Sequence, residues 1–132
     1  MIRLLALVLM LSSALHAQDL ATEIRAVIDE YENAVRANTL KIINAPTEEE
    51  KNKYRQTIPS AGPCATKLMQ IIKANADKPE VVPAVCWLVT GAASFPEGEE
   101  AKKMLATTYA GSAGIAPTVR QLEYQGLFGE PA

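Results

Sequence analysis

The sequence predicts an all-α protein of five or six helices arranged in antiparallel hairpins. Apolar residues recur at steps of three, four and seven, which is the spacing of one helix face, and no segment alternates apolar and polar residues over the length of a strand. Proline, glycine and capping residues divide this pattern into segments of helix length. The chain has 132 residues, of which 48% are hydrophobic and 21% charged, as expected for one globular domain and not for a disordered segment.

Residues 1–17 are typical of a secretory signal peptide. Arg3 gives the start a positive charge, residues 4–11 form an unbroken apolar run, and Ala17 precedes polar residues. The run is shorter than the about 20 residues that a helix needs to span a bilayer. We expect cleavage after Ala17, or alternatively after Ala14, so that no membrane anchor remains. Residues 18–132 then form a single helical domain, exported to the periplasm or the cell exterior. An uncleaved amphiphilic helix is the alternative.

Removal of the signal segment also removes His16, the one histidine of the chain. A protein without histidine lacks the base of Ser-His-Asp and Cys-His mechanisms and has no imidazole ligand for a metal. The 13 basic and 15 acidic residues give a formal net charge of −2, so no nucleic-acid partner is expected. We expect no cofactor and no metal, because the carboxylates of residues 48–50 and 97–100 lack calcium-loop spacing and the glycines match no phosphate-binding fingerprint.

The longest amphipathic segment follows the signal-like residues, and Asp19 is a suitable N-cap for it. The sequence Asn44-Ala45-Pro46 should end this helix, because a residue before proline avoids the helical region. Asn38 occupies an expected apolar position, so the apolar face is weaker toward that end. The face consists of Leu20, Ile24, Val27, Ile28, Tyr31, Val35 and Ile42.

Two shorter helices are predicted next. Thr47 and Glu50 form a capping box for a short polar helix that ends near Thr57. A third helix follows Pro63, because proline is favoured in the first turn of a helix.

Three further segments have helical periodicity. A fourth helix covers residues 82–89, where Pro83 marks either its start or a kink. A fifth helix is expected over residues 97–109 and a last helical face over residues 115–122, whereas residues 126–132 show no periodicity. Helical hairpins of about 35 residues also occur in repeat proteins, so a short repeat-like array is a further architecture to consider.

Cys64 and Cys86 form an even pair of cysteines, which in an exported chain suggests a disulfide. If the third and fourth helices turn near Lys78, the two cysteines lie at unequal distances from the turn. The difference of six residues corresponds to about 9 Å along a helix axis, beyond the reach of a disulfide. Free cysteine on an apolar face packs as a small core residue. Buried thiols are therefore favoured, and a disulfide stays open as the alternative.

Two further motifs are interpreted as structural. Ala61-Gly62-Pro63-Cys64 differs from the thioredoxin redox tetrapeptide in having alanine where the nucleophilic first cysteine stands. Without that cysteine the tetrapeptide cannot perform dithiol exchange. Trp87 is a single aromatic residue on a predicted helix, and we expect it to pack between helices rather than to hold a ligand.

The residues between positions 84 and 124 follow a distinctive order of Trp87-Leu88, Gly91, a Pro-Glu linker, residues 101–105, Tyr109, Ile115 and Leu122. This order resembles the helical region upstream of the thioredoxin-like (redoxin) domain in exported bacterial thiol-disulfide oxidoreductases. In such proteins the downstream domain carries the redox chemistry, so the resemblance implies no catalytic residue here. Phe128-Gly129-Glu130-Pro131-Ala132 is similar to the opening of a redoxin domain. The chain is therefore expected to be either a module truncated before such a domain or a stand-alone helical module with a frayed end.

These observations predict an exported, non-catalytic helical interaction or spacer module that is related to envelope redoxin proteins and has an unidentified protein partner. One alternative is a thiol-disulfide redox protein that uses Cys64 and Cys86, which requires an exposed thiolate with a lowered pKa. A second alternative is a periplasmic binding protein that holds a small ligand in a polar-lined cavity between hairpins.

Overall fold

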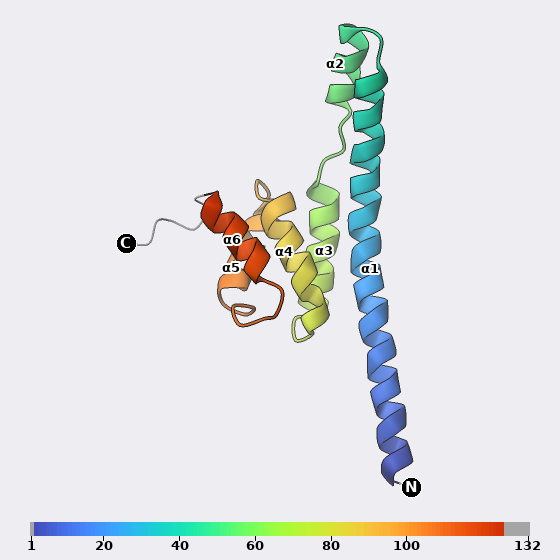
Figure 1. Cartoon of the computed structure of the whole chain (residues 1–132), viewed down its shortest axis with the longest axis vertical. Helices are drawn as coiled ribbons and strands as arrows, with labels where there is room; N and C mark the ends of the chain where they lie inside the picture. The colour runs from blue at the N-terminus through green and yellow to red at the C-terminus, as the bar shows by residue number, and fades with distance from the viewer. Residues whose placement is uncertain (1, 126–132) are drawn as a thin grey trace, which may run out of the picture.

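The computed structural model describes residues 2–125, with side chains from residue 15 onward. It confirms the all-α prediction, because residues 2–125 contain six α-helices, one short 3₁₀ helix and no strand. The carboxy-terminal residues 126–132, which include the redoxin-like end, lie outside the described residues. The elements are α1 (Ile2–Asn44), α2 (Glu48–Gln56), α3 (Gly62–Ala74), η1 (Pro79–Val81), α4 (Val82–Gly91), α5 (Pro96–Ala106) and α6 (Ala116–Tyr124) (Figure 1).

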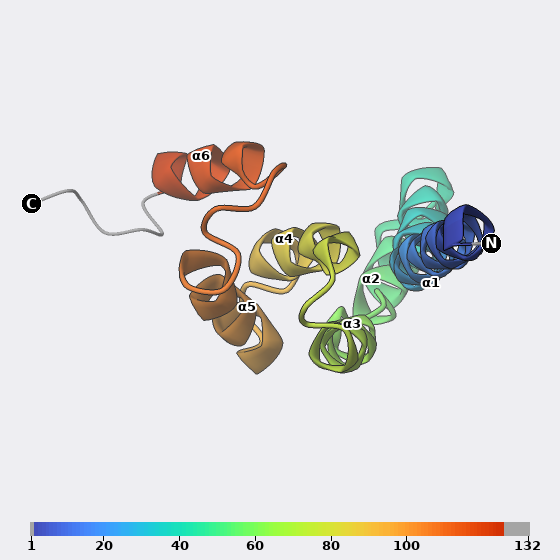
Figure 2. The same ribbon diagram turned by 90° about the horizontal axis from the view of Figure 1, so that it is seen from below.

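The long helix α1 forms one side of the molecule, and the other elements pack against it or against one another. The chain reverses after α1, so that α2 lies beside the end of α1, and α3 then runs along its middle (Figure 1). Seen along α1, the helices α3, α4, α5 and α6 extend successively away from one side of it (Figure 2). Helix α4 is central in this series, since it contacts α3, α5 and α6.

The core begins where the middle of α1 packs on α3 and η1, and it continues between α3, α4 and α5. Leu20 and Ile24 are buried on α1, whereas Val35 and Ile42, further along the predicted apolar face, are only half-buried. The core therefore covers only part of the length of α1. Each large aliphatic side chain that is fully buried contributes about 1.5–3 kcal/mol relative to an exposed one. The largest fully buried side chains are Leu68, Ile72, Val81, Val85, Leu88, Leu105 and Leu122.

Helix α1 has no boundary at Asp19, where the sequence predicted a cap. The helix continues through this position without a break from residue 2. The reason is that residues 2–18 are rich in leucine and alanine and contain neither glycine nor proline, so nothing interrupts helical hydrogen bonding. No helix in the described part of the chain is long and apolar enough to cross a membrane. Removal of residues 1–17 on export stays a prediction.

The predicted cap of the short second helix is confirmed. Thr47 has an extended backbone, and its side-chain oxygen accepts a hydrogen bond from the backbone N–H of Glu50 at 3.2 Å. Pro83, which marked either a start or a kink, lies in the first turn of α4 directly after the 3₁₀ turn η1. A proline N–H is not needed there, because the first N–H groups of a helix have no partner within it.

Helix α5 ends earlier than predicted, at Ala106 rather than at Tyr109. The backbone N–H of Tyr109 donates to the carbonyl of Met104 at 3.0 Å, which closes a wider turn than a regular helix allows. The Tyr109 side chain is buried by this turn, and its hydroxyl donates to the carbonyl of Ala76 at 2.9 Å. A tertiary contact therefore decides the end of α5.

Asn38, which weakened the predicted apolar face of α1, fixes the position of α2. Its side chain is only 7% exposed. The amide Nδ2 donates to the carbonyl of Tyr54 at 2.8 Å, and the amide Oδ1 accepts from the hydroxyl of Thr57 at 3.3 Å. Tyr54 belongs to the last turn of α2 and Thr57 is its C-cap, whose N–H also donates to the Tyr54 carbonyl at 3.1 Å. Asn38 therefore caps the end of α2 from a neighbouring helix.

We predict that Asn38→Ala lowers the free energy of unfolding by about 1–3 kcal/mol, because it removes two partly buried hydrogen bonds between α1 and the end of α2. Urea titration followed by circular dichroism measures this loss, and hydrogen exchange should show faster opening of α2 than of α3. Asn33→Ala is the matched control, since Asn33 is exposed on the same helix. Equal stability of the two variants would contradict the capping role of Asn38.

Gly98, in the first turn of α5, lies against the backbone at the end of α4. A Cβ atom at this buried position would collide with the backbone carbonyl of Ala92, which closes the end of α4. The contact is with backbone atoms, so no rotamer change relieves it. Close packing of α5 on α4 therefore depends on glycine at position 98.

We predict that Gly98→Ala destabilises the fold by about 1–3 kcal/mol, since the two helices must move apart. Gly111→Ala is the control, because no atom lies within 4 Å of the added Cβ there. Thermal unfolding of the two variants provides the comparison, and a Gly98→Ala protein as stable as the control would disprove this account of the turn.

Candidate functional site

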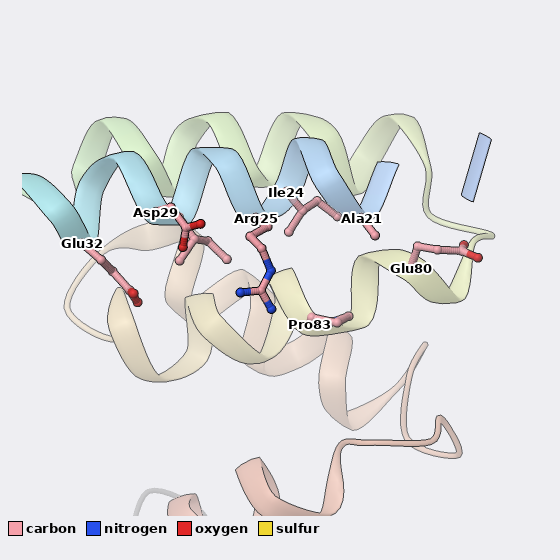
Figure 3. A pocket seen from close by; sticks show the side chains of 8 residues that line it. Ala21, Ile24, Arg25, Asp29, Glu32, Glu80 and Pro83 are labelled. Atoms are coloured by element: carbon pink, nitrogen blue, oxygen red, sulfur yellow. The ribbon is translucent and has the colours of Figure 1, made fainter. Parts of the chain in front are cut away.

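A groove lies along the seam between α1 and the start of α4. It has a volume of about 360 Å³, within the range of sites that hold small molecules. Ala21, Ile24 and Ile28 from α1 and Pro83 from α4 supply its apolar surface. Its charged lining combines one basic and three acidic side chains. These are Arg25, Asp29 and Glu32 from α1 and Glu80 from η1 (Figure 3).

The helical spacing of α1 places an apolar and a charged edge side by side. Ile24 is buried and Ile28 half-buried, and both belong to the stripe that faces the core. Arg25, Asp29 and Glu32 follow one another at steps of four and three, so they form a neighbouring stripe that is exposed. The packing of η1 against α1 then brings Glu80 to the same groove.

Arg25 is the central charged group of the groove. Its guanidinium group extends into the space between α1 and α4, with Asp29 and Glu32 on one side and Glu80 on the other (Figure 3). Among residues 15–125, Arg25 takes part in none of the ion pairs or side-chain hydrogen bonds, and the same is true of Asp29 and Glu80. A guanidinium group carries five N–H donors in a planar fork that matches a carboxylate. The groove therefore presents unpaired donors beside an apolar floor.

Glu32 is held in place by the tryptophan of α4. The Trp87 indole N–H donates to Glu32 Oε1 at 3.2 Å. The same indole packs edge-to-face on Tyr31, with ring centroids 5.7 Å apart and an interplanar angle of 87°. Trp87 thus packs between helices, as the sequence predicts, and it also links the groove to the interface of α1 with α4.

The sequence-predicted candidates, Cys64 and Cys86, lie outside this groove and are not joined to each other. Cys64 is buried at the start of α3, and its thiol donates to the carbonyl of Val27 on α1 at 3.7 Å. Burial raises the pKa of the Cys64 thiol, and the opposing influence of nearby Lys67 is smaller. Cys86 is half-buried on α4.

Several glutamates of the acidic runs are engaged in structural contacts. Glu48 pairs with Lys51 at 2.7 Å and with Arg55 at 3.7 Å, and the hydrogen bond and charge of Lys51 lower the Glu48 pKa. Glu97 accepts from the Thr66 hydroxyl at 3.0 Å, which ties α5 to α3. Within the part of the chain that the structure describes, no group of three or more His, Cys, Asp or Glu residues is arranged to hold a metal ion.

Arg25, Asp29 and Glu80 are not recognisable as functional residues from the sequence. Charged residues beside the apolar stripe of a helix are common, so the spacing of Arg25 and Asp29 carries no special signal. Glu80 joins them only because η1 packs on α1. The packing of these elements was therefore needed to find the groove.

We predict that the two thiols of the folded protein react at different rates. Cys64 should be alkylated at least about tenfold more slowly than Cys86 at neutral pH, because it is buried and its pKa is raised. Mass spectrometry of iodoacetamide-treated protein over time measures both rates, and the unfolded protein in urea is the control. Rapid labelling of Cys64 in the folded state would contradict the buried position.

The raised pKa also predicts how stability depends on pH. Below the pKa of the unfolded thiol, about 8.5, both states are protonated and the contribution of Cys64 is complete. As the pH rises from there toward the higher folded pKa, the unfolded state loses its proton first and stability falls. Cys64→Ala should reduce this alkaline loss in urea titrations, whereas Cys86→Ala should leave it in place.

Comparisons with known protein families, curated proteins and solved structures found no match to this chain.

Proposed function

We propose that the chain is an exported, non-catalytic helical binding module whose interaction surface is the groove between α1 and α4. The observation that carries this proposal is the unpaired guanidinium group of Arg25 above the apolar floor made by Ile24 and Ile28. Ligand sites combine an apolar lining with a few convergent polar groups, and this groove has both. Export is supported by the signal-like residues 1–17.

A second hollow, between α3 and α5, is less suited to binding. The hollow between α3 and α5 is lined by Lys73 and Glu100, which neutralise each other in an ion pair of 2.9 Å. Glu97, in the same hollow, already accepts a hydrogen bond from Thr66. A ligand would have to replace these contacts, whereas Arg25 offers its donors without such a loss.

The alternative of a thiol-disulfide redox protein has less support. A redox-active thiol is accessible and has a lowered pKa, whereas Cys64 is buried and burial raises its pKa. Cys64 lies in the first turn of α3, where the helix dipole favours the thiolate, but the loss of hydration is the larger influence. The chemistry of the site therefore favours binding over thiol exchange.

We further propose that the module is related to the helical region that precedes redoxin domains in envelope proteins. The order of residues 84–124 supports this relation, and so does the signal-like start. In such an arrangement a helical module binds or spaces a neighbouring protein domain.

Nuclear magnetic resonance of the isotope-labelled protein tests the proposed binding function. We expect pools of charged small molecules and short peptides to shift the amide signals of residues 21–32 and 80–82. Arg25→Gln should abolish these shifts, because it removes the charged donors while keeping a polar side chain of related shape. Arg36→Gln, an exposed position on α1 outside the groove, is the control. Shifts that avoid these residues, or that survive Arg25→Gln, would refute the groove as the binding surface.

A further inference from the structure

We infer that the ligand of the groove is a basic amino acid, a molecule with one carboxylate and two cationic groups. This inference rests on the proposed binding function and adds the chemical class of the ligand. It follows from the signs of the four charged side chains in the lining and from their order along the groove.

The charges of the lining are complementary to such a ligand. One cation, Arg25, stands against three carboxylates, so the lining has a formal charge of −2. A ligand with one carboxylate and two cations gives each kind of group a partner of opposite sign. The guanidinium group of Arg25 can bind a carboxylate through two parallel hydrogen bonds, which is the strongest contact that the lining offers.

The order of the charged groups distinguishes the two ends of the ligand. Arg25 lies between Asp29 and Glu32 on one side and Glu80 on the other (Figure 3). The adjacent carboxylate and α-ammonium of an amino acid therefore fit Arg25 together with Asp29 and Glu32. The side-chain cation then extends toward Glu80. Hydrogen bonding to Trp87 keeps Glu32 in position for the α-ammonium.

The apolar surface between these charged ends fits the aliphatic part of a basic side chain. Ala21 and Ile24 lie on α1 between Arg25 and the end of the groove that holds Glu80, and Pro83 faces them from α4 (Figure 3). Lysine and arginine side chains cover apolar surface with their methylene groups while their charged ends stay hydrated. An aliphatic chain with a terminal cation can therefore pack on the apolar floor and place its charge beside Glu80.

The same lining disfavours other classes of amino acid. An acidic amino acid would place a second carboxylate near Glu80, where like charges repel. A neutral amino acid would leave Glu80 without a partner and so lose one charge-assisted contact. Polyanions such as nucleic acids are disfavoured as well, because three carboxylates of the lining repel them and only one arginine attracts them.

Trp87 provides the readout for a test, because it is the only tryptophan of the chain and its indole is bonded to Glu32. We expect lysine and arginine to change its fluorescence at saturating concentrations. Norleucine lacks the side-chain cation, lysinamide lacks the carboxylate and Nα-acetyl-lysine lacks the α-ammonium. Each should bind about tenfold or more weakly than lysine, since each loses one hydrogen-bonded charge. Titrations at low ionic strength keep the exposed charges from being screened.

Two variants assign the contacts to residues. With Arg25→Gln, lysine and lysinamide should bind with similar affinity, because the carboxylate has lost its partner. With Glu80→Gln, lysine should lose its advantage over norleucine. Arg36→Gln and Glu123→Gln are exposed controls outside the groove and should bind lysine as the unchanged protein does. Circular dichroism verifies that all variants are folded.

The outcomes separate this inference from the proposed function. Norleucine binding as tightly as lysine would overturn the basic class. So would binding of a peptide with a carboxy-terminal lysine in the absence of lysine binding, because the occupant would then be a chain end. Resonance shifts in residues 21–32 with other ligands, without any effect of lysine or arginine, would likewise overturn the inference and leave the binding function standing. No shift with any pool would overturn both.

Discussion

The burial of one short stretch of α1 is the interaction on which the rest of the structure depends. Leu20 and Ile24 enter the core beside α3 and α4, with Val27, Ile28 and Tyr31 packed at its margin. Apolar contacts of this kind supply most of the stability of packed helices, because the helix alone is marginal in water. The same turns of α1 carry Arg25 and Asp29 on the adjacent face. The core contact therefore also fixes the geometry of the groove.

The polar contacts serve mainly to orient elements that apolar burial brings together. Asn38 caps α2, Trp87 joins α4 to Glu32, and the Tyr109 hydroxyl holds the end of α5 against the turn after α3. Each of these bonds links residues far apart in the chain. Each of these bonds contributes about 0.5–1.5 kcal/mol net. They therefore affect the orientation of the helices more than the total stability. Arg25 differs from them, because its donors have no partner in the described part of the chain.

Sequence reasoning predicted the helices well where local chemistry decides them. Thr47 caps α2, the Ala45-Pro46 pair ends α1, and Pro83 stands in the first turn of α4. It was wrong about the cap at Asp19 and about the end of α5. In the first case the flanking residues favour continued helix. In the second case a hydroxyl bond to Ala76 draws Tyr109 out of the helix.

The sequence by itself determined the helical class, most helix boundaries and the apolar faces, because these depend on periodicity and on capping residues within a few positions of one another. It also supplied the signal-like segment and the pair of cysteines. Only the tertiary structure decided that Asn38 meets Tyr54, that the Cys64 thiol is buried against Val27, and that Glu80 joins Arg25 in one groove. These contacts join separate elements, and they depend on how helices are rotated and offset against each other. Side-chain spacing along one helix does not specify that arrangement, because several helix crossings satisfy the same apolar stripe.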